Sequence, residues 1–149
     1  MKLKLMVSKE KEKDLIDFFA GLGIEIDDDA DLVLTEKNRT ISYLPVKDSV
    51  GDRQSISVDE IIFMESFGHD VTVHTGHGEY MTQEPLGQLI GMLDPTRFLR
   101  ISNSCVISAR HVKKIKPLLS MKYSLTMSNK EVVEVTRSYS PIFRDFFNI

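Results

Sequence analysis

The sequence predicts a mainly β protein with an α+β part at its N-terminus. Short stretches of alternating apolar and polar residues, separated by turn-forming Gly, Pro, Asn and Asp, recur along most of the chain and are typical of strands. Only three stretches have the spacing of apolar residues that an amphipathic helix requires. A polar stretch at residues 47–54, which contains Gly51, separates an early α+β pattern from a later series of strands. We therefore expect two domains.

The first domain, residues 1–48, is expected to be a small β-α-β-β module. Its strand, helix and two further strands are predicted, in chain order, at residues 2–7, 8–23, 31–36 and 39–46. The helix should bury Leu15, Phe18 and Phe19, because these apolar residues follow its spacing. The dipeptide Lys37–Asn38 lies between the last two strands and suggests a hairpin turn.

The second domain, residues 53–149, is expected to consist of short strands and two helices. The strands are predicted at residues 55–58, 60–66, 70–75, 79–83, 98–102, 105–108, 111–118, 123–127 and 131–136. The helices are predicted at residues 84–95 and 138–147. Pro85 suits the first turn of the earlier helix, and Pro95 ends it.

A basic stretch is hidden within an overall acidic chain whose net charge is −3. Residues 1–51 hold 8 Lys/Arg and 11 Asp/Glu, a balance of −3, whereas residues 52–149 hold 11 of each, a balance of zero. Residues 97–122 contain no acid but carry Arg97, Arg100, Arg110, Lys113, Lys114, Lys116 and Lys122. A charge run is usually a solvated surface, but one without any acid indicates a polyanionic partner such as nucleic acid.

The single cysteine, Cys105, excludes an intramolecular disulfide framework and fits a reducing compartment. It alternates with Ile107 and should pack inward as a small hydrophobic side chain. The chain starts with charged residues instead of a signal peptide, and no run approaches the roughly 20 apolar residues of a membrane span. We therefore expect a cytoplasmic protein.

An enzyme is not expected, because no carboxylate pair, catalytic-triad spacing or phosphate-binding Gly loop is present. Cys105 lacks a paired base, so we assign no catalytic residue and no cofactor. His74, His77 and His111 could suggest a metal site. However, two histidines in one hairpin, His74 and His77, do not make a site without a third ligand of suitable geometry, and Cys105 is remote in sequence, so no metal is expected.

Three motifs follow one another late in the chain: "RFLRISNSCVIS", "HVKKIKP" and "VTRSYSPIFRDFF". The stretch from Ser55 to Phe147 that contains them resembles the LytTR DNA-binding domain of bacterial transcription regulators. The resemblance implies an elongated fold of small packed β-sheets with short helices, preceded here by the β-α-β-β module. It also implies that loops and strand ends, not a recognition helix, enter the major groove of double-stranded promoter DNA. The target sites would be imperfect direct repeats.

The resemblance assigns base contacts to His69, Asn103 and Arg137. The expected phosphate contacts are Arg100, Ser102, Arg110, Lys113, Lys114, Lys116 and Ser138. Of the adjacent Lys113 and Lys114, only one should face a given groove, because side chains alternate along a strand. Each base-contact assignment has a plainer alternative. His69 could be a turn residue without a role, Asn103 could cap its turn, and Arg137 could pair with Glu134.

The N-terminal domain departs from regulators that carry a full receiver domain, since residues 1–47 are too short to form one. We expect it to mediate dimerisation, at least on DNA, or contact with a controlling protein, which by family analogy would be a membrane protein. The rival hypothesis is a protein-interaction module that has this fold without DNA binding. Glu131 and Glu134, close to Arg137 in sequence, favour that rival.

Overall fold

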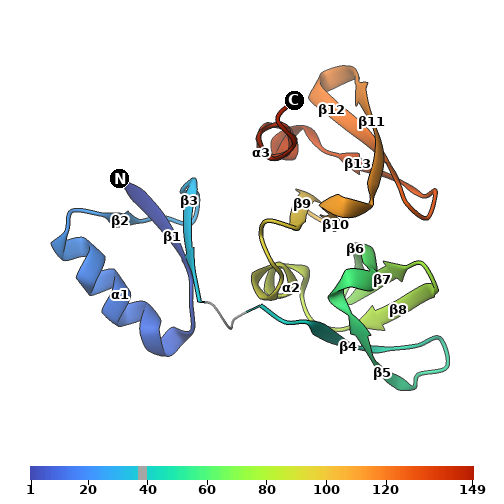
Figure 1. The fold of residues 1–149 in the computed structure, drawn as a ribbon, viewed down its shortest axis with the longest axis horizontal. Helices are drawn as coiled ribbons and strands as arrows, with labels where there is room; N and C mark the ends of the chain where they lie inside the picture. Colours follow the sequence, from blue (N-terminus) through green and yellow to red (C-terminus); the bar gives the residue numbers. More distant parts are fainter. Residues whose placement is uncertain (37–39) are drawn as a thin grey trace. The chain divides into compact units, whose positions relative to one another are not determined.

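The computed structural model describes residues 1–36 and 40–149, which divide into two compact units (Figure 1). The first unit is Met1–Ile41 and the second is Ser42–Ile149. This division falls a few residues before the polar stretch 47–54, where the sequence suggested a linker. Within the described residues, none of the helices has the length and apolar character that crossing a membrane requires.

The first unit is a three-stranded parallel sheet with one helix (Figure 1). Its elements are β1 (Lys2–Met6), α1 (Lys9–Gly21), β2 (Glu25–Ile26) and β3 (Leu32–Thr35), and the sheet order is β2-β1-β3. Helix α1 provides the crossover that two parallel neighbours, β1 and β2, require. Gly23 lies just beyond the helix with a φ of 76°, in the left-handed region that favours glycine after a helix end.

The expected burial of helix α1 is wrong in part. Phe18 is 61% exposed, and Leu15 and Phe19 are only half-buried. The helix contains no fully buried residue. A three-stranded sheet with one short helix offers too little surface to cover every apolar side chain, as is usual for units of this size.

The expected pairing of strands 31–36 and 39–46 is also wrong. The later strand is β4 (Tyr43–Lys47), and it pairs antiparallel with β5 (Arg53–Ser57) of the second unit, whereas β3 pairs with β1. The predicted Lys37–Asn38 turn lies outside the described residues.

The polar stretch after β4 forms a hairpin turn, which explains why it is not a linker. Asp48 Oδ1 accepts hydrogen bonds from the backbone N–H groups of Val50 and Asp52, at 3.1 and 2.9 Å. Gly51 adopts a φ of 88°, a conformation that glycine reaches without strain. An Asp that bonds the backbone ahead of it and a left-handed glycine are the residues that such a turn requires.

The second unit contains a seven-stranded and a three-stranded antiparallel sheet (Figure 1). The larger sheet has the order β5-β4-β8-β7-β6-β10-β9, and its remaining strands are β6 (Ile61–Phe67), β7 (Asp70–Thr75), β8 (Gly78–Thr82), β9 (Phe98–Ser102) and β10 (Cys105–Ser108). The smaller sheet consists of β11 (Val112–Leu118), β12 (Lys122–Met127) and β13 (Val132–Val135), in that order. The helices are α2 (Leu86–Met92) and α3 (Ser140–Phe147), with 3₁₀ turns η1 (Val58–Glu60), η2 (Ala109–His111), η3 (Leu119–Met121) and η4 (Arg137–Tyr139).

One apolar core joins the two sheets of the second unit to helix α3. Phe63 and Ile101 from the larger sheet, Leu125 from the smaller sheet and Phe143 from α3 are all at most 1% exposed and belong to one cluster. The backbone N–H of Thr136 donates to the carbonyl of Ile101 at 3.0 Å, which fixes the end of β13 beside β9. The core therefore sets the relative position of the turns that follow these strands.

Cys105 is buried, as predicted, and only 6% exposed. Burial raises the pKa of its thiol to about 12, with a smaller contribution from the negative charge of Glu65. The ordinary value is 9.0. Because the thiolate is the reactive form, this position predicts an inert cysteine.

Native Cys105 is expected to react with iodoacetamide at about pH 8 at least ~100-fold more slowly than the same cysteine in urea-unfolded protein. The rise in pKa lowers the thiolate fraction, and packing blocks access. Mass spectrometry over time measures both rates. Similar rates in the folded and unfolded protein would contradict the buried position.

Candidate nucleic-acid interface

Three predicted base-contacting residues lie on separate segments of the second unit, and all three are exposed. His69 follows Gly68 in the turn between β6 and β7, where Gly68 has a φ of 61°. Asn103 lies in the two-residue turn between β9 and β10, and Arg137 opens the η4 turn after β13. His69 and Asn103 lie in turns between paired strands and Arg137 lies just beyond a strand end, so each exposed side chain is available to a partner.

Tyr139 ties the second of these segments to the third. Its hydroxyl donates a hydrogen bond to Asn103 Oδ1 at 2.9 Å. Because the amide oxygen is occupied, the NH₂ group of Asn103 remains to donate to a ligand, and it has no hydrogen bond to another described residue. Tyr139 is thus a positioning residue. It stands within the "VTRSYS" motif, although the sequence analysis gave it no role.

Arg100 shapes the same turn from within. Its Nε donates to the carbonyl of Ser102 at 3.2 Å, and its Nη2 donates to the carbonyl of Asn103 at 2.6 Å. Ser102 is only 8% exposed, and its hydroxyl accepts from the backbone N–H of Ser104 at 3.2 Å. Both residues therefore support the Asn103 turn, whereas their phosphate contacts remain predictions.

Two surface hollows connect the three segments. The first is lined by His69, Arg100 and Asn103, among others. The second is lined by Asn103, Thr136 and Ser138, together with Glu65 and Glu134. Asn103 lines both hollows and so lies between the His69 turn and the η4 turn. The first hollow joins His69 to Asn103, 34 positions apart (103 − 69), and the second joins Asn103 to Ser138, 35 positions apart (138 − 103).

The guanidinium of Arg137 is available for a ligand. It makes no hydrogen bond or ion pair with any residue in the described part of the chain. The alternative pairing with Glu134 is not formed; Glu134 Oε1 instead lies 3.4 Å from Lys122 Nζ. Its chain neighbours Thr136 and Ser138 line the second hollow. An exposed, unpaired arginine at this position is chemically suited to bind a base edge or a phosphate.

The basic stretch is less free of acids in space than in sequence. Asp59, from η1, pairs with Arg97 and lies 3.6 Å from Arg110. Asp59 precedes the basic stretch by 38 residues (97 − 59), so this contact is not apparent from the sequence. The acid lowers the charge that Arg97 and Arg110 can offer to a phosphate.

The lysines of β11 are exposed and line neither hollow. Lys114 pairs in register with Thr126 and Lys116 with Ser124, on either side of Ile115, which packs against the core. Lys114 and Lys116 therefore share the outer face of the smaller sheet. Lys113 stands at a register shift between Val112 and Lys114, so simple alternation does not fix its direction.

The second unit is thus a β-sheet domain that exposes the three predicted contact residues in turns and at a strand end. Residues 53–148 match the family model described as the LytTr DNA-binding domain, and the chain belongs to this family. A solved LytTr DNA-binding domain of a putative methyl-accepting/DNA response regulator from Bacillus cereus has the same fold, with a TM-score of 0.69 and 22% identity. That match covers 73% of this chain and 99% of the other. The predicted mainly β fold of the LytTR type is confirmed.

The curated relatives are longer proteins. Sensory transduction protein LytR of Staphylococcus saprophyticus is 29% identical over 115 residues, which cover 76% of this chain and 44% of the relative. Sensory transduction protein LytT of Bacillus cereus is 26% identical over 106 residues, covering 71% and 42%. Transcriptional regulatory protein LytR of Staphylococcus aureus is 33% identical over 73 residues, covering 49% and 30%. This chain spans less than half the length of each.

Proposed function

We propose that this protein is a transcription regulator that binds double-stranded promoter DNA with sequence preference. The observation that carries the proposal is the family match over residues 53–148. It is supported by the exposed side chains of His69 and Asn103, which line two adjoining hollows, and by the exposed Arg137 between Thr136 and Ser138 of the second hollow. His69, Asn103 and Arg137 are the residues that we assign to base edges in the major groove.

The chemistry of these side chains supports the assignment. The guanidinium of Arg137 can donate to O6 and N7 of guanine together, and the free NH₂ group of Asn103 can donate to an acceptor on a base edge. A neutral His69 offers one donor and one acceptor. The proposed phosphate contacts, which supply affinity without sequence preference, are Arg100, Ser102, Arg110, Lys113, Lys114, Lys116 and Ser138.

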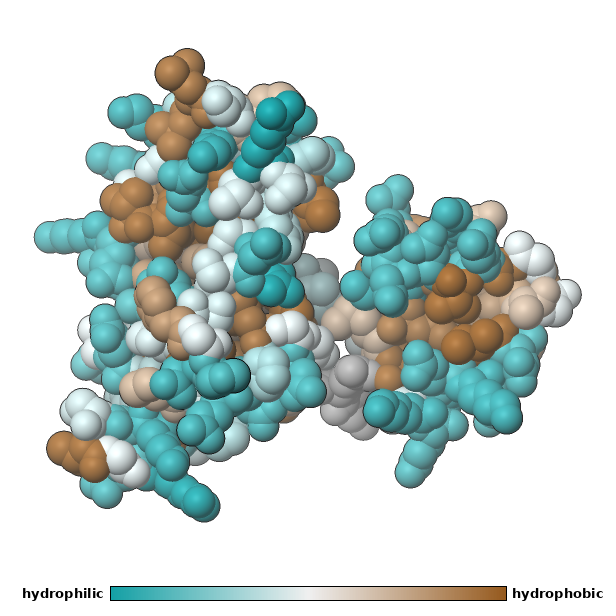
Figure 2. Space-filling view, turned by 180° about the vertical axis from the view of Figure 1, so that it is seen from behind, coloured by the Kyte–Doolittle hydropathy of each residue, from teal (hydrophilic) through white to brown (hydrophobic). Residues whose placement is uncertain are grey.

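The first unit is proposed to mediate homodimerisation, at least on DNA at imperfect direct repeats. Its support is an exposed apolar surface that includes Phe18, Leu22 and Leu32, each more than half exposed. Figure 2 shows apolar surface, in brown, on this unit. The other proposed partner of this apolar surface is a controlling membrane protein, which the first unit would contact from the cytoplasm. Sedimentation velocity of the full chain, free and bound to a two-repeat duplex, tests the dimer, and one copy per duplex at saturation would contradict it.

The second candidate function is a protein-interaction module that does not bind DNA. Acidic groups close to the proposed interface favour it, namely Glu65 and Glu134 in the hollow beside Asn103. A mobility-shift titration against the protein's own upstream region and a scrambled duplex separates the two functions. Preferential retardation of the upstream duplex supports the regulator, whereas no retardation of either duplex at low salt supports the interaction module.

Tyr139→Phe tests the geometry of the interface without removing a proposed base contact. Loss of the hydroxyl frees Asn103 Oδ1 and releases the amide orientation, so binding to the specific duplex should weaken by about 0.5–1.5 kcal/mol. Binding to the scrambled duplex should stay unchanged. Tyr43→Phe is the matched control, because Tyr43 is 64% exposed on β4, outside the interface. An unchanged preference in Tyr139→Phe would remove the positioning role.

A further inference from the structure

His74 is a buried histidine outside the proposed DNA interface. It lies on β7, is only 6% exposed, and stacks on Phe63 with ring centroids 4.0 Å apart and an interplanar angle of 13°. A neutral core histidine would be expected to satisfy its ring nitrogens with hydrogen bonds. His74 does not do so with any residue that the structure describes.

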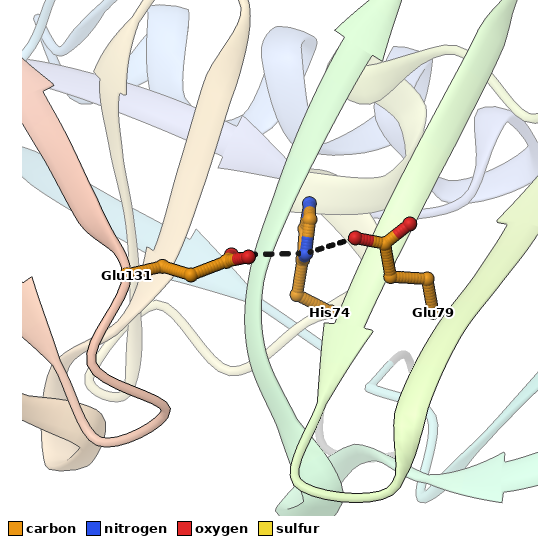
Figure 3. Close-up of side chains that lie close together, drawn as sticks. All are labelled: His74, Glu79 and Glu131. Carbon is orange, nitrogen blue, oxygen red and sulfur yellow. Dashed lines mark ion pairs between the residues drawn. The ribbon is translucent and has the colours of Figure 1, made fainter.

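Two carboxylates converge on one nitrogen of this ring. Glu79 Oε1, from β8, lies 3.4 Å from His74 Nδ1, and Glu131 Oε2, from the turn between β12 and β13, lies 3.2 Å from the same atom. Figure 3 shows that they approach the edge of the ring from opposite sides. The three ligand atoms lie within 4.8 Å of one another.

A hydrogen bond does not account for this arrangement. Nδ1 can carry one hydrogen, and that hydrogen lies in the ring plane, between two carboxylates that approach from either side. Neither contact meets the geometry of a hydrogen bond, and an uncompensated pair of carboxylates at one nitrogen repels itself. A cation on the in-plane lone pair of Nδ1 would instead face both carboxylates at once.

We propose that His74 Nδ1, Glu79 and Glu131 bind a divalent transition-metal cation such as Zn²⁺. One imidazole nitrogen and two carboxylate oxygens are ligands that Zn²⁺ accepts, and three protein ligands leave a fourth position for water. Coordination through Nδ1 requires the remaining hydrogen on Nε2; Glu65 Oε1 lies 3.1 Å from that atom, although the pair does not meet hydrogen-bond geometry in this structure. A carboxylate beside the distal nitrogen is the usual outer partner of a metal-bound histidine.

The bound cation would act as a structural link. His74 and Glu79 belong to the β7–β8 hairpin of the larger sheet, whereas Glu131 belongs to the turn that leads into β13 of the smaller sheet. In the sequence, His74 stands close to His77 and far from Glu131, so this combination of ligands is not apparent there. The structure exposes His77 and gives His111 Nδ1 a hydrogen-bonding partner, Ser128 Oγ, at 2.8 Å.

The test uses untagged full-length protein, stripped with a chelator and titrated with Zn²⁺ by calorimetry. Wild-type protein should bind one equivalent and melt at a higher temperature with Zn²⁺ than without it. Glu79→Gln and Glu131→Gln should each weaken Zn²⁺ binding at least about tenfold, since even loss of an outer partner costs a metal site about 10–100-fold. Visible absorption of added Co²⁺ provides an independent readout of coordination.

Glu134→Gln is the matched control. Its side chain is 50% exposed, against 48% for Glu131, and it pairs with Lys122 instead of His74. It should bind Zn²⁺ as the wild-type protein does. Both ligand variants change exposed residues and should fold, which His74 variants need not do. No binding by the wild-type protein, or equal affinity in all three variants, would overturn the proposal and leave the three residues as an ion-pair cluster.

Discussion

Arg137→Ala is expected to weaken binding to the specific duplex by about 1–3 kcal/mol, with much less effect on a scrambled duplex. A guanidinium that bonds two acceptors of one guanine discriminates between sequences, and no other described residue competes for Arg137. Fluorescence anisotropy titrations against both duplexes, over a range of salt, measure the effect. Equal weakening on both duplexes would make Arg137 a phosphate contact instead.

Two variants provide the comparison. Lys114→Ala removes a proposed phosphate contact, so it should weaken binding to both duplexes alike and lower the salt slope by about one unit. Arg53→Ala removes an exposed arginine on β5, outside the interface, and should change neither. If neither Arg137→Ala nor Lys114→Ala changes the measured affinity, these residues do not make the DNA contacts assigned to them, and the interaction-module hypothesis gains most.

Phe143→Ala is expected to lower the free energy of unfolding by about 3–5 kcal/mol. Phe143 is fully buried in the core that joins both sheets of the second unit to helix α3. Its ring lies 5.1 Å from that of Tyr123 and 4.8 Å from that of Phe147, measured between centroids. Truncation removes these contacts and leaves a cavity that a sheet-bound helix can only partly close.

Urea denaturation followed by circular dichroism measures this loss. Ile142→Ala is the control, because Ile142 precedes Phe143 on the same helix but is 56% exposed. It should change the free energy of unfolding by no more than about 0.5 kcal/mol. Similar losses in the two variants would show that burial of Phe143 in the core does not dominate the effect.

Local patterning determined much of the second unit. Alternation of apolar and polar residues predicted its strands, and the spacing of Leu86 and Leu89 predicted helix α2, where both are buried. The same alternation predicted the burial of Cys105. These predictions succeed because a strand or helix must bury one face, and this requirement sets the spacing of apolar residues along a short stretch of sequence. The order of the three motifs also indicated the LytTR family without information about tertiary contacts.

Strand partnership was decided only by the tertiary structure. The pattern of residues 39–46 indicated a strand, but it did not say whether that strand pairs with β3 or with β5. In the structure this strand, β4, pairs antiparallel with β5, because the turn that contains Asp48 and Gly51 closes that hairpin over a few residues. In the first unit, the helical spacing identified the apolar residues of α1. The small sheet could not cover Phe18.

The candidate sites divide in the same way. The exposure of His69, Asn103 and Arg137 was predictable, because turn and strand-end positions are legible in sequence. The contact of Tyr139 with Asn103, the pairing of Asp59 with Arg97, and the approach of Glu131 to His74 were not. Each joins segments tens of residues apart, and sheet register together with packing of the shared core sets which side chains meet. A local pattern reports which face of a strand is buried, but it contains no information about which distant turn lies beside it.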